Sequence, residues 1–475
     1  MVKELTPSFF SIRRLSEGVK NGSISPVDLV EVCIERIRKF NPILNAFITV
    51  IKEDALKQAQ LSEKDIRQGK YLGPLHGIPF SIKDILYAKG IRCTAGSKIL
   101  SNCVSEVDST SVKKMKNAGA ILIGTNNLNE FASGINGINP FYGSSKNPWN
   151  TSRISGGSSG GSSVAVATGM APVSLGTDTG GSIRVPSSFC GVVGLKPTYG
   201  RISRYGVMPL SPSLDHIGCI TRSAWDAAAV LECISGWDHL DKGSINKRVP
   251  IYTKIIEDSR AEKFSVGIPT NYFSEFLHPE VERLFHDFIE KVRLANNVIH
   301  DVVLHNTEKY YRYWRDVRIA EASQIHLKWL RTRAEQYSIE VRNMLIQGTK
   351  VSAVEYIRAM NTIKEIKNEF LSILNEMCAI IVPTTIIPAP GFDERTISID
   401  DDTFQTRKAL LRNTIIFNST GLPAVTIPIG LTKEGLPVGA QIIGPPFRED
   451  TILSIAYNYE CTNNTASKFV PPPCT

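Results

Sequence analysis

Two glycine- and serine-rich loops, close together in the chain, constrain this sequence more than any other feature. Residues 155–163 and 180–182 hold six glycines and six serines, and Ser158 and Ser182 each follow directly after a pair of glycines. A short apolar run typical of a strand, residues 173–175, lies between the loops. Because glycine has no side chain, it leaves a neighbouring hydroxyl and the adjacent backbone amides uncovered. The segment therefore predicts a serine nucleophile beside an oxyanion-binding turn.

Strand-sized apolar runs alternate with helical patterns, which predicts an α/β fold around a large mixed sheet. Strands are expected at residues 46–51, 77–82, 120–123, 173–175, 264–268, 298–303, 379–382, 424–427 and 438–443. Helices are expected at about residues 26–40, 52–68, 108–117, 162–168, 223–233, 308–347 and 353–377. Glu434-Gly435 predicts a hairpin between the last two strands, and residues 383–398 predict a surface loop. No repeat or linker divides the chain, so residues 1–475 are expected to form one domain, with N-terminal helices at about 1–70 packed on the core.

The composition is that of a soluble globular protein, since 42% of the 475 residues are hydrophobic and 21% are charged. The net charge of +8 is dispersed, which favours solvated helix faces over nucleic-acid binding. Nine cysteines without a CxxC pair, and histidines without an HExxH pair, argue against a disulfide framework and a metal site. We therefore expect a cytoplasmic protein with no metal. The absence of 18 consecutive apolar residues predicts no membrane span.

Three interpretations of the glycine–serine loops compete with the serine nucleophile described above. Residues 157–161 match G-x-S-x-G, but an α/β-hydrolase elbow follows an apolar strand, and residues 147–155 (NPWNTSRIS) cannot form one. A phosphate-binding loop lacks both the GK[ST] and the GxGxxG pattern. Purely structural turns are less favoured, because there are two such loops and the second has Asp178 and Arg184 beside it.

A lysine is the best candidate for the base. Lys83 ends the apolar run of residues 77–82, and burial at a strand end would lower its pKa toward neutrality. A lysine whose stem is buried and whose ammonium reaches solvent is the default for an isolated strand end. Together with the two serines, however, Lys83 completes a set of nucleophile, relay and base. Cys190 lies near the second loop, but its apolar neighbours favour a buried structural thiol.

These residues resemble the motifs of the amidase signature family, in family order and over nearly the whole chain. The matching blocks are GPLHGIPFSIKD (73–84), GTNNLNEFASG (124–134), NPWN (147–150), GGSSGG (156–161), GTDTGGSIRVPSSFCGVVGLKPTYGRISRYG (176–206), SLDHIG (213–218), FNSTGLPAVTIPIG (417–430) and GLPVGAQIIG (435–444). The resemblance implies a single α/β/α domain around a large mixed sheet. It also implies amide hydrolysis through an acyl-enzyme and a Ser–cis-Ser–Lys triad, with no organic cofactor.

The resemblance assigns a role to each motif residue. Ser182 is the nucleophile, Ser158 the bridging serine and Lys83 the base. The peptide amides of Thr179, Gly180, Gly181 and Ser182 would form the oxyanion hole, and Ser159, Asp178 and Arg184 would support the loops. The physical logic agrees, because neutral Lys83 can draw a proton from Ser182 through Ser158 and return it to the leaving amine.

The family contains free-standing amide hydrolases and the glutaminase component of the tRNA-dependent amidotransferase, and two departures favour the former. The amidotransferase type typically carries a segment like NLARYDGVRYG, which residues 310–330 lack. It also places an aspartate seven positions before the asparagine that is Asn418 here, and that position is Leu411. We therefore expect a small amide substrate and no nucleic acid. The amidotransferase component stays as the alternative, and the oligomeric state is left open, a homodimer included.

Two further features of the substrate side stay open. Arg342 could face a substrate carboxylate, although it also fits the helices of the family in general. The aromatic residues Tyr310, Tyr311, Tyr313, Trp314 and Trp329 could wall a pocket, although core packing is favoured for most of them.

Overall fold

An eleven-stranded mixed sheet organises the chain, in a computed structural model that describes residues 9–295, 297–399, 402–463 and 468–472. The strand order is β1-β3-β2-β4-β6-β5-β12-β13-β9-β7-β8. These strands are β1 (Phe47–Val50), β2 (Pro79–Lys83), β3 (Ile121–Asn126), β4 (Val173–Asp178), β5 (Val193–Lys196), β6 (His216–Thr221), β7 (Ser265–Pro269), β8 (Val298–Val302), β9 (Ala379–Pro383), β12 (Ala424–Leu431) and β13 (Pro437–Ile443). A separate two-stranded sheet joins β10 (Thr396–Ile399) to β11 (Asp402–Gln405). The predicted α/β class with a large mixed sheet is confirmed.

The middle of the sheet is buried on both faces, which explains its near-continuous apolar sequence. Every residue of β2, β3, β4, β6 and β13 is buried. β2 pairs in parallel with both β3 and β4, whereas β4 pairs antiparallel with β6. Since β2 and β4 run side by side in the same direction, their carboxyl ends, at Lys83 and Asp178, meet at one edge.

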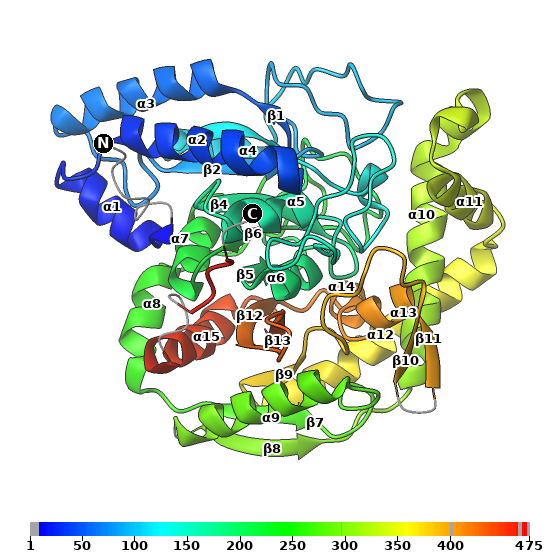
Figure 1. Cartoon of the computed structure of the whole chain (residues 1–475). Helices are drawn as coiled ribbons and strands as arrows, with labels where there is room; N and C mark the ends of the chain where they lie inside the picture. The colour runs from blue at the N-terminus through cyan, green and yellow to red at the C-terminus, as the bar shows by residue number, and fades with distance from the viewer. Residues whose placement is uncertain (1–8, 296, 400–401, 464–467, 473–475) are drawn as a thin grey trace.

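Helices cover both faces of this sheet (Figure 1). The longer ones are α1 (Ile12–Lys20), α2 (Pro26–Leu44), α3 (Lys52–Arg67), α4 (Thr110–Asn117), α5 (Gly160–Ala167), α7 (Ala224–Ile234), α9 (Pro279–Leu294), α10 (Tyr310–Thr332), α11 (Ile339–Gly348), α12 (Ala353–Glu376) and α15 (Glu449–Asn463). The shorter ones are α6 (Arg184–Cys190), α8 (Tyr252–Asp258), α13 (Thr406–Leu411) and α14 (Ile415–Ser419). Figure 1 shows α10 and α11 along one side of the molecule, next to the β10–β11 hairpin. In the described part of the chain, no helix combines the length and apolarity that crossing a bilayer requires.

The helix predicted to end before Pro42 runs on to Leu44 and ends at Asn45, which adopts a left-handed backbone (φ 51°). Proline lacks one amide hydrogen, but here it lies in the last turn, where fully buried Leu44 anchors the helix to the core.

The helix predicted over residues 308–347 is divided into α10 and α11. Ser338 begins the second helix by accepting a hydrogen bond from the amide of Val341, so a capping serine marks the break.

The surface loop predicted at residues 383–398 is wrong in its first half. Ile386, Ile387 and Ala389 are buried and pack in one apolar cluster with Phe189 and Trp314. Burial of these apolar side chains outweighs the loop composition around them. In its second half, residues 396–398 belong to β10.

Candidate active site

Lys83 lies at the carboxyl end of β2 and is fully buried. Its Nζ lies 2.6 Å from Ser158 Oγ and 2.7 Å from Thr177 Oγ1. Burial lowers the pKa of Lys83 to about 7, although the carboxylates of Asp178 and Asp215 act in the opposite direction. A substantial fraction of Lys83 is therefore a neutral amine near pH 7, able to accept a proton.

The loop before α5 carries Ser158, and the peptide bond between Gly157 and Ser158 is cis. Ser159 ties this loop to the second loop, because its amide donates to the carbonyl of Ser182 (3.1 Å). The Ser159 hydroxyl also donates to the carbonyl of Thr177 (3.1 Å). The fold thus brings both loops against the end of β4, as the motif order predicts. Within the described residues, Ser158 Oγ bonds Lys83, and no hydrogen bond joins it to Ser182 Oγ.

A buried ion pair holds the second loop in shape. Arg184 and Asp178 have no solvent exposure, and Arg184 reaches both carboxylate oxygens, at 3.0 Å from Nη2 and 3.1 Å from Nε. The same carboxylate accepts the amides of Gly181 (2.7 Å) and Ile183 (3.0 Å). The chain from 181 to 184 is therefore wrapped around one carboxylate, which fixes the backbone on either side of Ser182.

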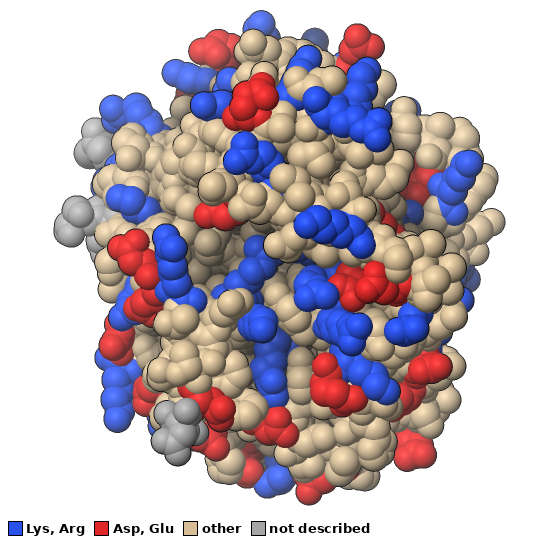
Figure 2. Space-filling model, turned by 90° about the vertical axis from the view of Figure 1, so that its right-hand side faces the viewer, with Lys and Arg blue, Asp and Glu red and all other residues tan. Residues whose placement is uncertain are grey.

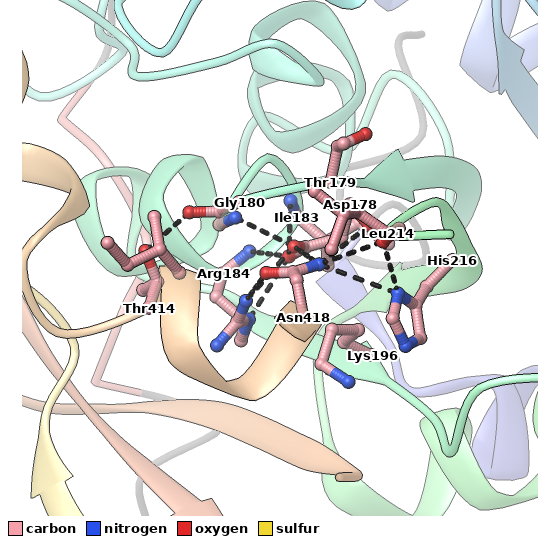
Figure 3. A network of polar contacts seen from close by, with 12 residues as sticks. Asp178, Thr179, Gly180, Ile183, Arg184, Lys196, Leu214, His216, Thr414 and Asn418 are labelled. Carbon is pink, nitrogen blue, oxygen red and sulfur yellow. Dashed lines mark hydrogen bonds and ion pairs between the residues drawn. The ribbon is translucent and has the colours of Figure 1, made fainter. Parts of the chain in front are cut away.

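Asn418, on α14, completes this brace from a distant part of the chain. Its amide nitrogen donates to Asp178, and its oxygen accepts from Arg184 (2.6 Å), as Figure 3 shows. Burial would raise the pKa of Asp178, but the charge and hydrogen bonds of Arg184 lower it below its ordinary value. Asp178 is therefore ionised throughout the neutral range.

The four backbone amides expected to bind the oxyanion differ in this structure. The Gly181 amide donates to Asp178. Among the described residues, no hydrogen-bond partner is found for the amides of Thr179, Gly180 and Ser182. Trp314 Nε1 donates to the carbonyl of Thr179 (2.9 Å), and Thr414 Oγ1 to that of Gly180 (2.6 Å). These two bonds fix the orientation of the peptide units on which an oxyanion site depends.

Three cavities meet at this loop. Ser182 lines a narrow cavity of about 10 Å³ together with Trp314 and Leu411. A cavity of about 220 Å³ adjoins it at Ala132, Thr179 and Leu210, and one of about 670 Å³ adjoins it at Gly134, Ile135 and Arg407. Ser182 therefore lies between two larger spaces that can take the two sides of an amide substrate.

Sequence reasoning missed the polar residues that hold the catalytic loops. They are Thr177, Asp215, Trp314, Thr414 and Asn418. Asp215, whose side chain accepts from Thr179 Oγ1 (2.6 Å), lies in the recognised SLDHIG block, which was a usable signal. Thr414 and Asn418 lie more than 200 positions from the loop, and no local pattern marks them.

The sequence leaves Arg342 and the aromatic run open, and the structure separates their places. Arg342 lines none of the three cavities. Of the aromatic residues, Trp314 lines the Ser182 cavity, whereas Tyr310 packs in the core with Phe370. Trp329 stacks on Phe131 (5.9 Å between ring centres).

Replacement of Arg184 by methionine is expected to destabilise the protein strongly. It leaves the buried carboxylate of Asp178 without its guanidinium, which costs about 3–5 kcal/mol of unfolding free energy. Urea denaturation would measure this loss. Arg38→Met is the control, since it removes an exposed pair with Glu35 and should cost less than about 1 kcal/mol. Equal losses in the two variants would contradict the bracing role of Arg184.

Comparisons with known proteins agree with the motif assignment. The family model described as Amidase matches residues 28–453. The A-type chain of the glutamyl-tRNA(Gln) amidotransferase of Geobacter sp. (strain M21) is 36% identical over 474 residues, covering 95% of this chain and 96% of that protein.

Two solved structures share both fold and sequence. One, described as a vestigial protein complex that reveals the origins of an s-triazine catabolic enzyme, superposes with a TM-score of 0.91 at 30% identity, covering 95% of this chain and 98% of that one. The peptide amidase of Stenotrophomonas maltophilia gives a TM-score of 0.84 at 28% identity, covering 96% and 97%. The motifs, the fold and these matches together show that the chain belongs to the amidase family, the amidase signature family of enzymes acting on amide C–N bonds.

Proposed function

We propose that this protein hydrolyses a carboxamide through an acyl-enzyme on Ser182, with Ser158 as proton relay and Lys83 as base. The observation that carries the proposal is the 2.6 Å contact between Lys83 Nζ and Ser158 Oγ, made by a buried lysine with a pKa of about 7. The backbone link between Ser159 and Ser182 supports it, because it fixes the two serine loops against each other.

The reaction needs only groups of the chain and water. Neutral Lys83 accepts the Ser158 proton, Ser158 accepts the Ser182 proton, and Ser182 Oγ attacks the amide carbon. The amides of Thr179, Gly180 and Ser182 stabilise the resulting oxyanion, whereas the Gly181 amide would first have to leave Asp178. Collapse breaks the C–N bond as the relay returns a proton to the leaving nitrogen. Water, deprotonated by the same relay, then releases the acid.

The pH dependence of kcat/KM should report the base directly. Because the pKa of Lys83 is lowered to about 7, protonation removes the base below that pH and deprotonation restores it above. We expect kcat/KM to rise with an apparent pKa near 7 and to level off by about pH 8.5. A steady-state assay in constant-ionic-strength buffers would measure it. A rise centred near 10, the ordinary value for lysine, would contradict the assignment.

The comparisons support a different setting for this chemistry from the one that the motifs favour. The curated relative covers the chain end to end and is named as a component of an amidotransferase, which supports that alternative over a free-standing hydrolase. We therefore propose, as the favoured setting, that the chain releases ammonia within a complex of partner chains. Partner chains and tRNA then replace the expectation of a small-molecule partner alone. Leu411 beside Ser182 is the observation that keeps the free-standing hydrolase as the second candidate.

Purification from the native host would distinguish the two settings. In the amidotransferase setting, the protein co-purifies with partner chains, and amide hydrolysis rises when they and aminoacylated tRNA are present. In the free-standing setting, it purifies alone with full activity on a small amide, and added tRNA changes nothing. The Ser182→Ala protein serves as the inactive control in both assays.

A further inference from the structure

Two arginines share the narrow cavity of Ser182. Arg318 comes from α10 and Arg407 from α13, and both line that cavity with Trp314 and Leu411. Arg407 also lines the adjoining 670 Å³ cavity, so it lies where the narrow cavity opens outward. Figure 2 shows the face that carries α10 and α13, where Lys and Arg side chains gather around a central hollow.

Arg318 is buried without a full set of partners. Its side chain belongs to a residue that is 5% exposed, and among the described residues Nε has no hydrogen-bond partner. Nη1 makes one long contact with Ser133 Oγ (3.4 Å), and the guanidinium lies 5.0 Å from the ring centre of Trp314. A guanidinium carries five N–H donors, so much of this group's capacity is unused. Stacking on Trp314 accounts for its position, but not for its unused donors.

No carboxylate of the described chain neutralises the pair. Neither Arg318 nor Arg407 takes part in an ion pair within the described residues, and no Asp or Glu lines the narrow cavity. Glu340 and Glu394 line the larger cavity, where Glu394 pairs with Arg153 (3.2 Å). Burial lowers the pKa of Arg318 to about 9, and the charge of Arg407 adds to this effect. Two like charges held together without a counter-ion are costly unless a ligand supplies the anion.

We propose that the acyl part of the substrate carries a carboxylate, which Arg318 and Arg407 bind while its amide lies at Ser182. This inference rests on the proposed function of Ser182. Since one narrow cavity holds all three residues, the carboxylate and the amide are separated by a short chain. The lining contains no acidic group that would bind an ammonium, and Leu411 covers part of the wall. The substrate class is therefore a short dicarboxylic monoamide without an α-ammonium, which excludes glutamine as the preferred amide.

Calorimetric binding of product-like diacids tests the site independently of catalysis. Malonate, succinate and glutarate would be titrated into the full-length Ser182→Ala protein, with malonamide and succinamide as neutral counterparts. We expect a diacid to bind and the diamides not to. A second substitution, Arg318→Met or Arg407→Met, should weaken that binding about 10- to 100-fold, the value of hydrogen bonds to a charged group. Arg331→Met, at the exposed end of α10, should leave it unchanged.

Kinetics of the wild-type protein separate this inference from the proposed function. Malonamate, succinamate and glutaramate would be compared with propionamide, butyramide and glutamine. We expect Ser182-dependent hydrolysis of an acid monoamide with the highest kcat/KM, and Arg318→Met should raise KM for that substrate but not for the neutral amides. Ser182-dependent hydrolysis without preference for acids, or preference for glutamine, would overturn the inference and leave the proposed function intact. Absence of Ser182-dependent hydrolysis of all six would overturn the proposed function, and diacid binding would then still decide the arginine site.

Discussion

Ser182→Ala is expected to abolish amide hydrolysis, lowering kcat by about 10⁴-fold or more, because no other hydroxyl lies at the end of this relay. Ser182 is 5% exposed and lines the cavity between the two larger spaces, so the change removes one oxygen without disturbing a packed core. Ammonia release from the best amide would measure the loss.

Ser159→Ala is the matched control. It removes a neighbouring hydroxyl that donates to the Thr177 carbonyl, while its backbone link to Ser182 remains. We expect a much smaller decrease in kcat, about that of one lost loop hydrogen bond. A Ser182→Ala protein that keeps wild-type activity would show that the nucleophile lies elsewhere.

Lys83→Met is expected to lower kcat/KM by about 10²- to 10⁴-fold, the usual contribution of a positioned general base. Methionine fills the same buried volume but accepts no proton from Ser158. The rising limb near pH 7 should disappear from the remaining activity. Thermal unfolding would confirm that the variant keeps its fold.

Thr177→Val tests the second contact of the lysine. It removes the hydroxyl at 2.7 Å from Lys83 Nζ but keeps the base itself. We expect a modest loss of activity with the pH limb retained. If Lys83→Met instead kept wild-type rates across pH 6–9, the base assignment would be wrong.

Local patterns carried the sequence reasoning wherever the chemistry is local. Glycine pairs before Ser158 and Ser182, and a lysine closing an apolar run, require no knowledge of distant contacts. The parallel pairing of β2 with β4 then explains why Lys83 lies at the same edge as Asp178. The α/β class followed from alternation of apolar runs for the same reason.

Contacts between distant segments lay beyond that reasoning. Trp314 contacts the Thr179 carbonyl across 135 positions, and Thr414 contacts the Gly180 carbonyl across 234. Strands β5 and β6 were also missed, because they are short and each contains glycine. In the structure that glycine is required, since a Cβ on Gly218 would lie 2.0 Å from the carbonyl oxygen of Leu195.

Arg318 shows why a buried charge is hard to interpret from sequence. It follows the aromatic run in α10 and resembles any arginine on a solvated helix face. Only the structure shows that it is buried, that it stacks on Trp314 and that it shares a cavity with Ser182.

Mass-spectrometric mapping of a fluorophosphonate adduct tests the central claim most directly. The wild-type protein should carry one adduct, on the peptide that contains Ser182. That adduct should be absent from Ser182→Ala and should form slowly in Lys83→Met. An adduct on Ser158, or equal labelling of the wild-type and Ser182→Ala proteins, would contradict the account.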